Sequence, residues 1–439
     1  MSLMPMILGL ESLAFFVAGY LKRKDIKHPI VLFNIIWIIV ALLMFLNPME
    51  WYDISIKTYL IAIVGSFSFN YGGLILSKVS VKKTYAQQSV SYDDGIINGN
   101  KLLLIQMFLL IVTIPMLLKA FTFLKIYGWH DMRSIYANGI AYGYMTAFER
   151  MFYIHIVVFP LMQTCFYIQT ILYVKRKIPL WHLLIGVVNI ICTTIITVGR
   201  WDIVYIIIAM FFSLKFRQDK KIFNVSKKTK KRIYFLAGLM LIVVGYVTLN
   251  RHNSTGSILN TLINVLAGYF CCGLQLLDQM LENVSQSGLN EFSFGGAIFS
   301  GLFKVLNVLL MLLTGSRIQI PIVDVSSYSG NFFQVSPVQK MNAYVTWYYY
   351  FLRDFGIIGV ILISALLGAV AVKIYLKATK HPNTKNQVIY LHMVTILLFC
   401  SLWWEPIRME VVAKMLHNIW LMPFVGISRK RVSLYRKKT

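Results

Sequence analysis

Long apolar stretches separated by short polar connections dominate this chain. A helix needs about 20 apolar residues to cross about 30 Å of hydrocarbon. Hydrophobic residues make up 58% of the 439 residues and charged residues only 14%, whereas soluble domains have about 45–50% and about 25%. This composition excludes an ordinary soluble enzyme, a disordered chain and a disulfide-rich scaffold. Eleven stretches are interpreted as spans: 4–21, 30–47, 58–77, 102–122, 151–174, 180–198, 202–216, 233–249, 355–376, 387–404 and 411–427.

Basic residues are concentrated in one set of connections. If the spans alternate across the membrane, one set of connections lies on the same face of the membrane as the C-terminus. These connections hold 30 of the 43 Lys and Arg residues and four acidic residues. The rest of the chain holds 13 residues of each sign, so the net charge of +26 belongs to one face. Lys and Arg accumulate on the cytoplasmic side of a membrane. We therefore predict an all-α polytopic protein, one membrane domain over 1–439, with its N-terminus outside and its C-terminus in the cytoplasm.

The positive charge does not indicate nucleic-acid binding. A nucleic-acid surface places aromatic side chains among exposed basic residues, whereas the aromatic residues of this chain lie within the spans. The five cysteines also lie in apolar stretches, which predicts small core residues rather than a disulfide or metal site.

Residues 250–353 form the longest segment between the predicted spans. Within it, 256–282 is amphipathic and 296–315 is apolar. If both crossed the membrane, the total would be thirteen spans, but the link between them would then be cytoplasmic without any Lys or Arg. We therefore expect eleven spans and one large extracytoplasmic loop that contains two helices. Long loops of this kind are usually functional.

Four arginines lie at the outer ends of spans or within the large loop: Arg200, Arg251, Arg317 and Arg353. The planar guanidinium group matches a phosphate through two parallel hydrogen bonds, so these residues are candidate phosphate ligands. The alternative for each is an interfacial side chain or a local ion pair, such as Arg200 with Asp202. The motifs H-E-x-x-H, C-x-x-C and the P-loop are absent from the sequence, and we expect a metal-independent site.

Candidate proton acceptors are Asp354, Asp324 and His252, all in or beside the large loop. The alternative for a single acidic residue is a solvated charge or a helix cap. Other acidic residues with the same two interpretations are Asp131, Glu149, Glu405 and Glu410.

Asp354 is distinguished by its sequence context. Asn342 is followed by Thr346, and Asp354-Phe355-Gly356 then leads into a late span with Gly359. This pattern resembles that of oligosaccharide repeat-unit polymerases, the Wzy-type polymerases of O-antigen and capsule. The number of spans, the large late loop and the Gly199-Arg200 hairpin are similar to that family as well.

The resemblance implies a membrane glycosyltransferase with an architecture similar to the lipid-dependent (GT-C) type, in the cytoplasmic membrane of a bacterium. Such an enzyme transfers a glycan from undecaprenyl diphosphate to a new lipid-linked repeat unit at the outer leaflet. Arginines would stabilise the departing diphosphate, and a carboxylate or His would accept the proton of the attacking hydroxyl. Asn342 and Thr346 would contact the acceptor or shape the loop. Expected partners are the lipid-linked oligosaccharide, the bilayer, a chain-length regulator and a flippase.

Two other functions fit a polytopic chain. A flippase for lipid-linked oligosaccharides, or another secondary transporter, is the main alternative, although such proteins often show internal repeats and charges within several spans. An acyltransferase is a third possibility, and it would require a His or a His–Asp pair in the spans. His155, His392 and His417 are isolated from one another in the sequence.

Overall fold

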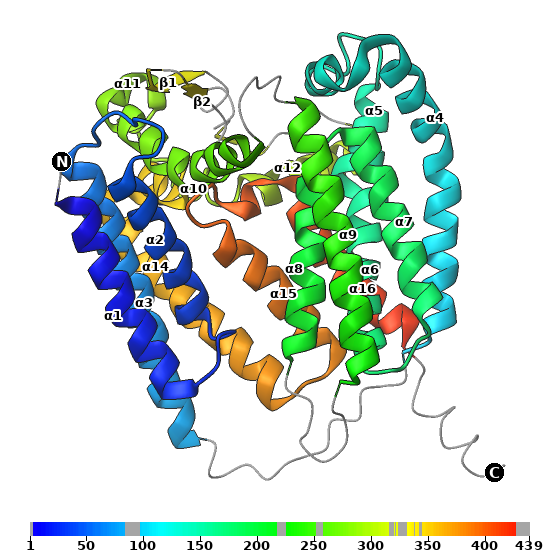
Figure 1. Ribbon diagram of the computed structural model, residues 1–439, viewed down its shortest axis with the longest axis horizontal. Coiled ribbons are helices and arrows are strands. Elements are labelled where there is room, and N and C mark those ends of the chain that lie inside the picture. The colour runs from blue at the N-terminus through cyan, green and yellow to red at the C-terminus, as the bar shows by residue number, and fades with distance from the viewer. Residues whose placement is uncertain are drawn as a thin grey trace. The chain divides into compact units, whose positions relative to one another are not determined.

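A computed structural model describes residues 3–83, 97–216, 225–251, 258–315, 320, 322–323, 332–337, 339–341 and 345–426. These residues are almost entirely helical, and Figure 1 shows how the helices are connected. The first group of helices comprises α1 (Met4–Arg23), α2 (Pro29–Leu46), α3 (Ile56–Lys83), α4 (Gly99–Ala137), α5 (Ala147–Glu149), the π-helix η2 (Arg150–Ile156), α6 (Val158–Val174), α7 (Leu180–Thr197), α8 (Trp201–Lys215) and α9 (Lys227–Arg251).

The remaining elements follow the first group along the chain. They comprise α10 (Ile258–Glu282), α11 (Val284–Ser287), α12 (Ser300–Thr314), α14 (Trp347–Lys380), α15 (Thr384–Leu398), the 3₁₀ helix η3 (Glu405–Ile407) and α16 (Met409–Val425). A small antiparallel sheet of β1 (Phe333–Ser336) and β2 (Gln339–Met341) lies between α12 and α14 in the sequence.

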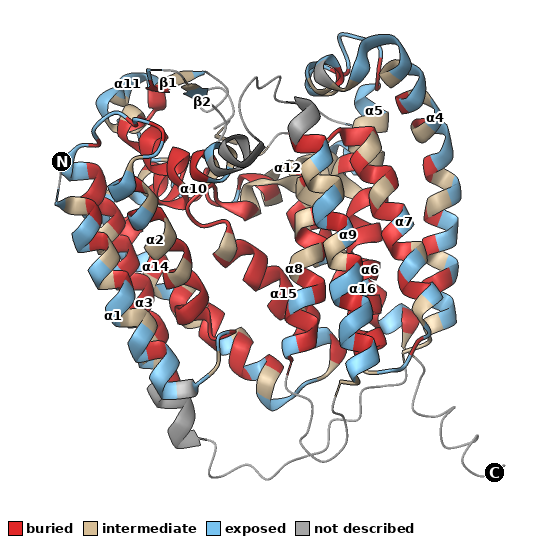
Figure 2. Cartoon of the chain, viewed as in Figure 1, coloured by how far each residue is buried: buried red, intermediate tan, exposed pale blue. Residues whose placement is uncertain are grey.

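Eight helices of the described chain are long and apolar enough to cross a membrane: α1, α2, α3, α4, the segment from α5 to α6, α7, α9 and α14. The other three predicted spans are also helical, but α8, α15 and α16 have only 15 to 17 residues. Large apolar side chains are exposed on these helices, for example Leu104, Phe108 and Ile111 of α4 at 63–64% (Figure 2). A lipid-facing surface accounts for this exposure. The chain is thus an all-α polytopic membrane protein.

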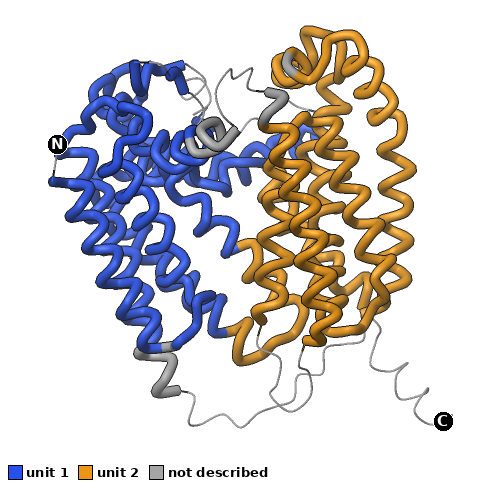
Figure 3. Tube along the Cα trace, viewed as in Figure 1, with its two compact units in different colours: residues 1–89, 256–376, 393–409 blue, residues 90–255, 377–392, 410–439 orange. Residues whose placement is uncertain are grey.

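The chain divides into two compact units, which we describe separately (Figure 3). Unit 1 comprises residues 1–89, 256–376 and 393–409. In this unit α1, α2 and α3 pack together, and α3 meets α14 where the backbones approach closely. A Cβ atom on Gly72 would lie 2.0 Å from the carbonyl oxygen of Ala365, and one on Gly368 would lie 1.9 Å from that of Phe69. Small residues allow such contacts between membrane helices.

Unit 2 comprises residues 90–255, 377–392 and 410–439. Its helices α4, α6, α7, α8 and α9 pack against one another. The connection from α7 to α8 has only three residues, and Val198 adopts a left-handed conformation (φ 48°) to make the turn. The tight hairpin expected around Gly199-Arg200 is therefore present.

The described part of the large loop contains the two expected helices. The amphipathic segment forms α10, which has 25 residues, and the apolar segment forms α12, which has 15. Neither is among the eight helices that could span a membrane. All five cysteines are buried and unbridged, as expected for core residues. On α10, burial raises the pKa of the Cys271 thiol, so this thiol is uncharged.

Candidate functional site

Helix α14 of unit 1 breaks at the point where the sequence predicts the start of a span. Phe355 and Gly356 have non-helical backbone angles, and Gly356 has a positive φ of 62°. A side chain at this position would be strained, since L-residues rarely adopt this conformation. The break frees backbone carbonyl oxygens of α14 for hydrogen bonds with another part of the chain. The segment between α11 and α12 makes these bonds: the N–H groups of Ser293 and Phe294 donate to the carbonyl oxygens of Arg353 and Asp354.

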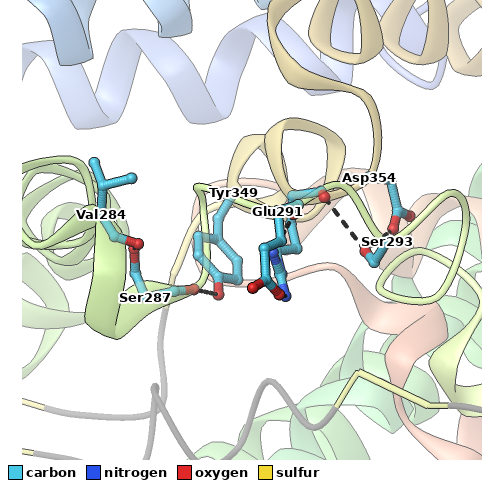
Figure 4. A network of polar contacts seen from close by, with 7 residues as sticks. Val284, Ser287, Glu291, Ser293, Tyr349 and Asp354 are labelled. Atoms are coloured by element: carbon cyan, nitrogen blue, oxygen red, sulfur yellow. Dashed lines mark hydrogen bonds and ion pairs between the residues drawn. The ribbon is translucent and has the colours of Figure 1, made fainter.

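Asp354 holds that segment in place. Its side chain is fully buried. Its Oδ1 accepts hydrogen bonds from the Ser293 hydroxyl and, at 3.0 Å, from the backbone N–H of Ala297, and its Oδ2 accepts one from Ile298 N–H at 2.8 Å. The Ser293 contact and its neighbours are drawn in Figure 4. A carboxylate with both oxygens engaged in this way acts as a structural clamp.

Arg353 and Tyr349 add further bonds to the same segment. The Tyr349 hydroxyl donates to the carbonyl oxygen of Ser287 at 2.7 Å, and Arg353 Nη1 donates to the carbonyl oxygen of Glu291. The Arg353 side chain is 8% exposed and that of Glu291 76%, with Nη2 and Oε2 at 3.9 Å. Arg353 Nε has no hydrogen-bond partner among the described residues. We call Asp354, Arg353 and Tyr349, together with the segment they hold, the loop anchor.

Thr346 lies just before α14 and is completely buried. Its hydroxyl donates to the carbonyl oxygen of Cys400 at 3.2 Å, and its N–H donates to that of Gly273 at 3.3 Å. The structure therefore uses Thr346 to fix the start of α14. Thr346 thus directly precedes the helix of unit 1 that carries Arg353 and Asp354.

Arg200 belongs to unit 2 and lies in the hairpin between α7 and α8. It is 6% exposed, and its Nη1 donates to the Thr248 hydroxyl of α9 at 2.6 Å. Asp202, two residues further along the chain, accepts a hydrogen bond from Gln163 Nε2 of α6 at 2.5 Å. Arg200 thus joins three helices at this end of unit 2.

Two arginines that were not among the expected phosphate ligands approach one aromatic ring in unit 2. The guanidinium carbon atoms of Arg133 and Arg150 lie 5.2 and 5.6 Å from the centre of the Tyr136 ring, which is cation–π distance. Arg133 donates to the carbonyl oxygen of Thr197 and Arg150 to that of Ala137. Neither guanidinium has a carboxylate within ion-pair distance in the described residues. Each therefore keeps most of its five N–H donors for another partner.

A His–carboxylate pair lies in the same unit. His155 Nδ1 of the π-helix η2 is 3.3 Å from Glu410 Oε2 at the start of α16, and their side chains are 25% and 19% exposed. The ring of His417 approaches the carbonyl oxygen of Ile156 with its Nε2 at 2.6 Å. His155 therefore has a carboxylate neighbour that its isolated position in the sequence does not indicate. π-Helical turns are rare and often occur at functional sites.

The charges around Tyr136 link these groups. Burial raises the pKa of Tyr136 to about 12, Arg133 and Arg150 oppose this rise, and Glu410 and Asp202 add to it. All four charged groups therefore act on one phenol. We call Arg133, Arg150, Tyr136, His155 and Glu410 the arginine cluster.

Some candidate residues from the sequence cannot be placed. Asp324, His252, Arg317 and Asn342 lie outside the described residues, as does the side chain of Arg251. In the described chain, no three His, Cys, Asp or Glu side chains come together to hold a metal ion.

A sequence signal for the arginine cluster was present. Thr146-Ala-Phe-Glu149 is a capping box, in which the Thr146 hydroxyl and the Glu149 carboxylate bond to each other's backbone N–H. It marks the start of a helix and places Arg150 directly behind it. The contact between His155 and Glu410 joins residues 255 positions apart, and no local pattern indicates it. In comparisons with known proteins, no family model, no curated protein and no solved structure matches this chain.

Proposed function

We propose that this chain polymerises lipid-diphosphate-linked oligosaccharide repeat units at the outer leaflet of a bacterial cytoplasmic membrane. The reaction would transfer the growing glycan from undecaprenyl diphosphate to a hydroxyl of a new lipid-linked unit. Eleven spans, an outer N-terminus, a GT-C-like arrangement, and a chain-length regulator and flippase as partners are parts of this proposal.

The observation that carries the proposal is the pair of guanidinium groups on Tyr136. Arg133 and Arg150 lack a carboxylate partner among the described residues and are only partly exposed. Two like charges that lie 5.2 and 5.6 Å from the centre of one ring repel each other, and an anion that binds beside them lowers this repulsion. Guanidinium groups form bidentate hydrogen bonds with phosphate oxygens. A diphosphate, which carries charge on both phosphates, matches two such groups.

The chemistry assigns a role to the four members of the arginine cluster other than Tyr136. As the bond between the anomeric carbon and the diphosphate oxygen breaks, Arg133 and Arg150 stabilise the charge on the leaving oxygens. The acceptor hydroxyl attacks the anomeric carbon and loses its proton to His155. Glu410 orients the imidazole and stabilises its protonated form, which is the common arrangement of a general base with a carboxylate partner.

The loop anchor has a positioning role in this proposal. Asp354 uses both oxygens to hold residues 293–298, and Arg353 holds Glu291. These residues fix a middle segment of the large outer loop to the start of a span. The pattern that resembles the polymerase family would then preserve the shape of the loop, with Asp354 as a positioning residue.

The test is surface-glycan length in a deletion strain that carries variants of the chain. Arg133→Ala with Arg150→Ala should abolish the polymer ladder while single repeat units still reach the surface, and Arg→Lys at both positions should restore it only in part. Arg232→Ala, at an exposed site of α9, is the matched control and should leave the ladder unchanged. Ladders of normal length from the double Ala variant would contradict the proposal.

A transporter is the second candidate, and one observation favours it. Lys414 of α16 is 3% exposed, and its ammonium nitrogen lies 4.5 Å from the centre of the Tyr205 ring of α8. A buried Lys within an apolar helix often marks an ion or substrate pathway. The same deletion strain separates the two functions, because loss of a flippase prevents even single repeat units from reaching the surface.

A further inference from the structure

Glu11 places a carboxyl group inside the helices of unit 1. It is the eighth residue of α1, so it lies roughly 10 Å along the helix from its first residue. Both carboxyl oxygens are buried, and neither makes a hydrogen bond of good geometry with a described residue. The neighbouring residues Leu10 and Leu13 are exposed apolar side chains, as expected for a helix that faces lipid on one side.

Two hydroxyl groups from other helices lie within electrostatic reach of this carboxyl. Ser66 of α3 is completely buried and its hydroxyl lies next to Glu11. Tyr348 of α14 is also completely buried and within electrostatic reach of Glu11. The Tyr348 hydroxyl makes no hydrogen bond of good geometry, and the indole N–H of Trp347 and the Cys400 thiol are near it. Gly65 makes room for the Tyr348 ring, because a Cβ atom there would lie 2.2 Å from the ring.

No positive charge compensates Glu11 in the described part of unit 1. Helix α2, which packs on α1, contains no titratable side chain. From α3 the facing group is Ser66 and from α14 it is Tyr348, neither of which is a cation. Lys22 of α1 is eleven residues further along the helix, where its ammonium donates to the Ser77 hydroxyl at 2.7 Å.

An ionised carboxylate without a partner is very unfavourable in such a site, and the group becomes neutral instead. The described groups offer oxygens from only Glu11, Ser66 and Tyr348, which is too few for a metal ion that needs about six. A proton needs only one oxygen atom to bind to. We propose that Glu11 is an exchangeable proton-binding site within the helices of unit 1, with Ser66 and Tyr348 as its hydrogen-bonding neighbours.

A row of buried polar side chains continues from this site. Asn70, one turn from Ser66 on α3, lies within 3.5 Å of the Ser66 hydroxyl. Asn70 and Asn34 of α2 exchange hydrogen bonds of 2.7 and 3.1 Å. Buried polar side chains in a membrane bundle are costly and commonly line ion or proton routes. The buried side chains of Ser66, Asn70 and Asn34 therefore form a polar row that begins next to Glu11. This inference does not depend on glycan polymerisation.

The probe is dicyclohexylcarbodiimide, an apolar reagent that partitions into membranes. A protonated carboxyl adds its O–H across a C=N bond of the reagent to give an O-acylisourea, and an acyl shift from oxygen to nitrogen then converts this adduct into a stable N-acylurea. A carboxylate without a proton does not add in this way. The purified full chain is labelled in liposomes at pH values from about 6 to 9, and labelled peptides are quantified by mass spectrometry. We expect Glu11 to be labelled, with a rate that falls about tenfold per pH unit above its titration midpoint.

Two controls belong to this experiment. Asp25 pairs with Lys27 at 3.4 Å and accepts a hydrogen bond from Tyr375, and this partnered group should remain unlabelled. Glu11→Gln resembles the protonated acid in shape, so it should lose the label while membrane abundance stays at the wild-type level. Three results would overturn the inference: no label at Glu11 in the folded chain when the unfolded chain is labelled, labelling that is independent of pH, or protection by Na⁺ at constant pH, which would indicate a metal-ion site.

Discussion

Asp354→Asn is the most informative single change in the loop anchor. It replaces one carboxylate oxygen by an NH₂ group and leaves the size of the side chain unchanged. If Asp354 only capped a helix, Asn would be a good replacement, because Asn is among the best N-cap residues. The structure instead predicts that Asn is a poor replacement for Asp354. Both oxygens of Asp354 are acceptors, and three donors from residues 293–298 face them.

The cost follows from these contacts. In the better orientation, the amide oxygen of Asn keeps Ser293 and Ala297, and the NH₂ group then faces the N–H of Ile298. A buried N–H without an acceptor costs about 1–3 kcal/mol, and each remaining bond loses about 1 kcal/mol when its acceptor is no longer charged. The total is about 3–5 kcal/mol against the docked segment. This corresponds to at least a ~100-fold rise in the fraction of molecules in which the segment is detached.

A glutamate-specific protease measures this fraction directly. Glu291 lies within the docked segment and its side chain is exposed, so cleavage after Glu291 requires only local detachment. When opening and closing are fast, the cleavage rate follows the population of the open form. We expect Asp354→Asn to be cleaved at Glu291 at least ~100 times faster than the wild type. Cleavage after Glu50, an exposed residue of another connection in unit 1, serves as the internal standard.

Ser293→Ala is the matched control, because it removes one donor and leaves the carboxylate intact. It should raise the cleavage rate about tenfold, in line with a loss of about 1–2 kcal/mol. A cleavage rate within about threefold of the wild type for Asp354→Asn would refute the clamp. If polymer was also lost in such a variant, Asp354 would be a base rather than a positioning residue.

Two further predictions concern the stability of the docked segment in unit 1 and the orientation of the chain in the membrane. Gly288 has a φ of 71°, and a Cβ atom there would lie 3.0 Å from the Arg353 guanidinium. Gly288→Ala should therefore destabilise the docked segment by about 1–2 kcal/mol and accelerate cleavage at Glu291, whereas Gly238→Ala, in open space on α9, should not. Reporter fusions after Arg176 should be cytoplasmic and fusions after Gly288 external. An external signal at Arg176 would contradict the predicted orientation.

The helices were predictable because the hydrocarbon core of a membrane offers no hydrogen-bond partners to the backbone. Backbone polar groups in hydrocarbon must bond within the segment, so an apolar stretch of sufficient length becomes a helix. The expected span that begins at Phe355 coincides with the break at Phe355 and Gly356. The amphipathic pattern of 256–282 likewise matches α10. Short helices such as α8 are harder to assign as spans, since length is the criterion that they fail.

The partners of the charged residues were not predictable to the same degree. Arg353 and Asp354 are neighbours in the sequence and suggest a local pair. The structure instead directs both toward residues about 60 positions earlier, Glu291 and Ser293. His155 and Glu410 are an example in unit 2, since their contact depends on how α16 packs. Composition and periodicity determine which face of a helix is apolar, but they do not determine which distant polar group lies opposite.

Burial and hydrogen bonding separate arginines that hold the fold from arginines that can hold a ligand. Arg353 is almost fully buried and bonds to a backbone carbonyl oxygen of the segment it fixes. Arg200 is similarly buried and bonds to Thr248 of a neighbouring helix. Arg150 is only partly exposed, uses one N–H on a backbone carbonyl oxygen and leaves its remaining donors near an aromatic ring. A phosphate ligand must combine low hydration with free donors, because buried donors that are already paired gain little from an anion. By this criterion Arg133 and Arg150 are better candidates for phosphate ligands than Arg200 and Arg353.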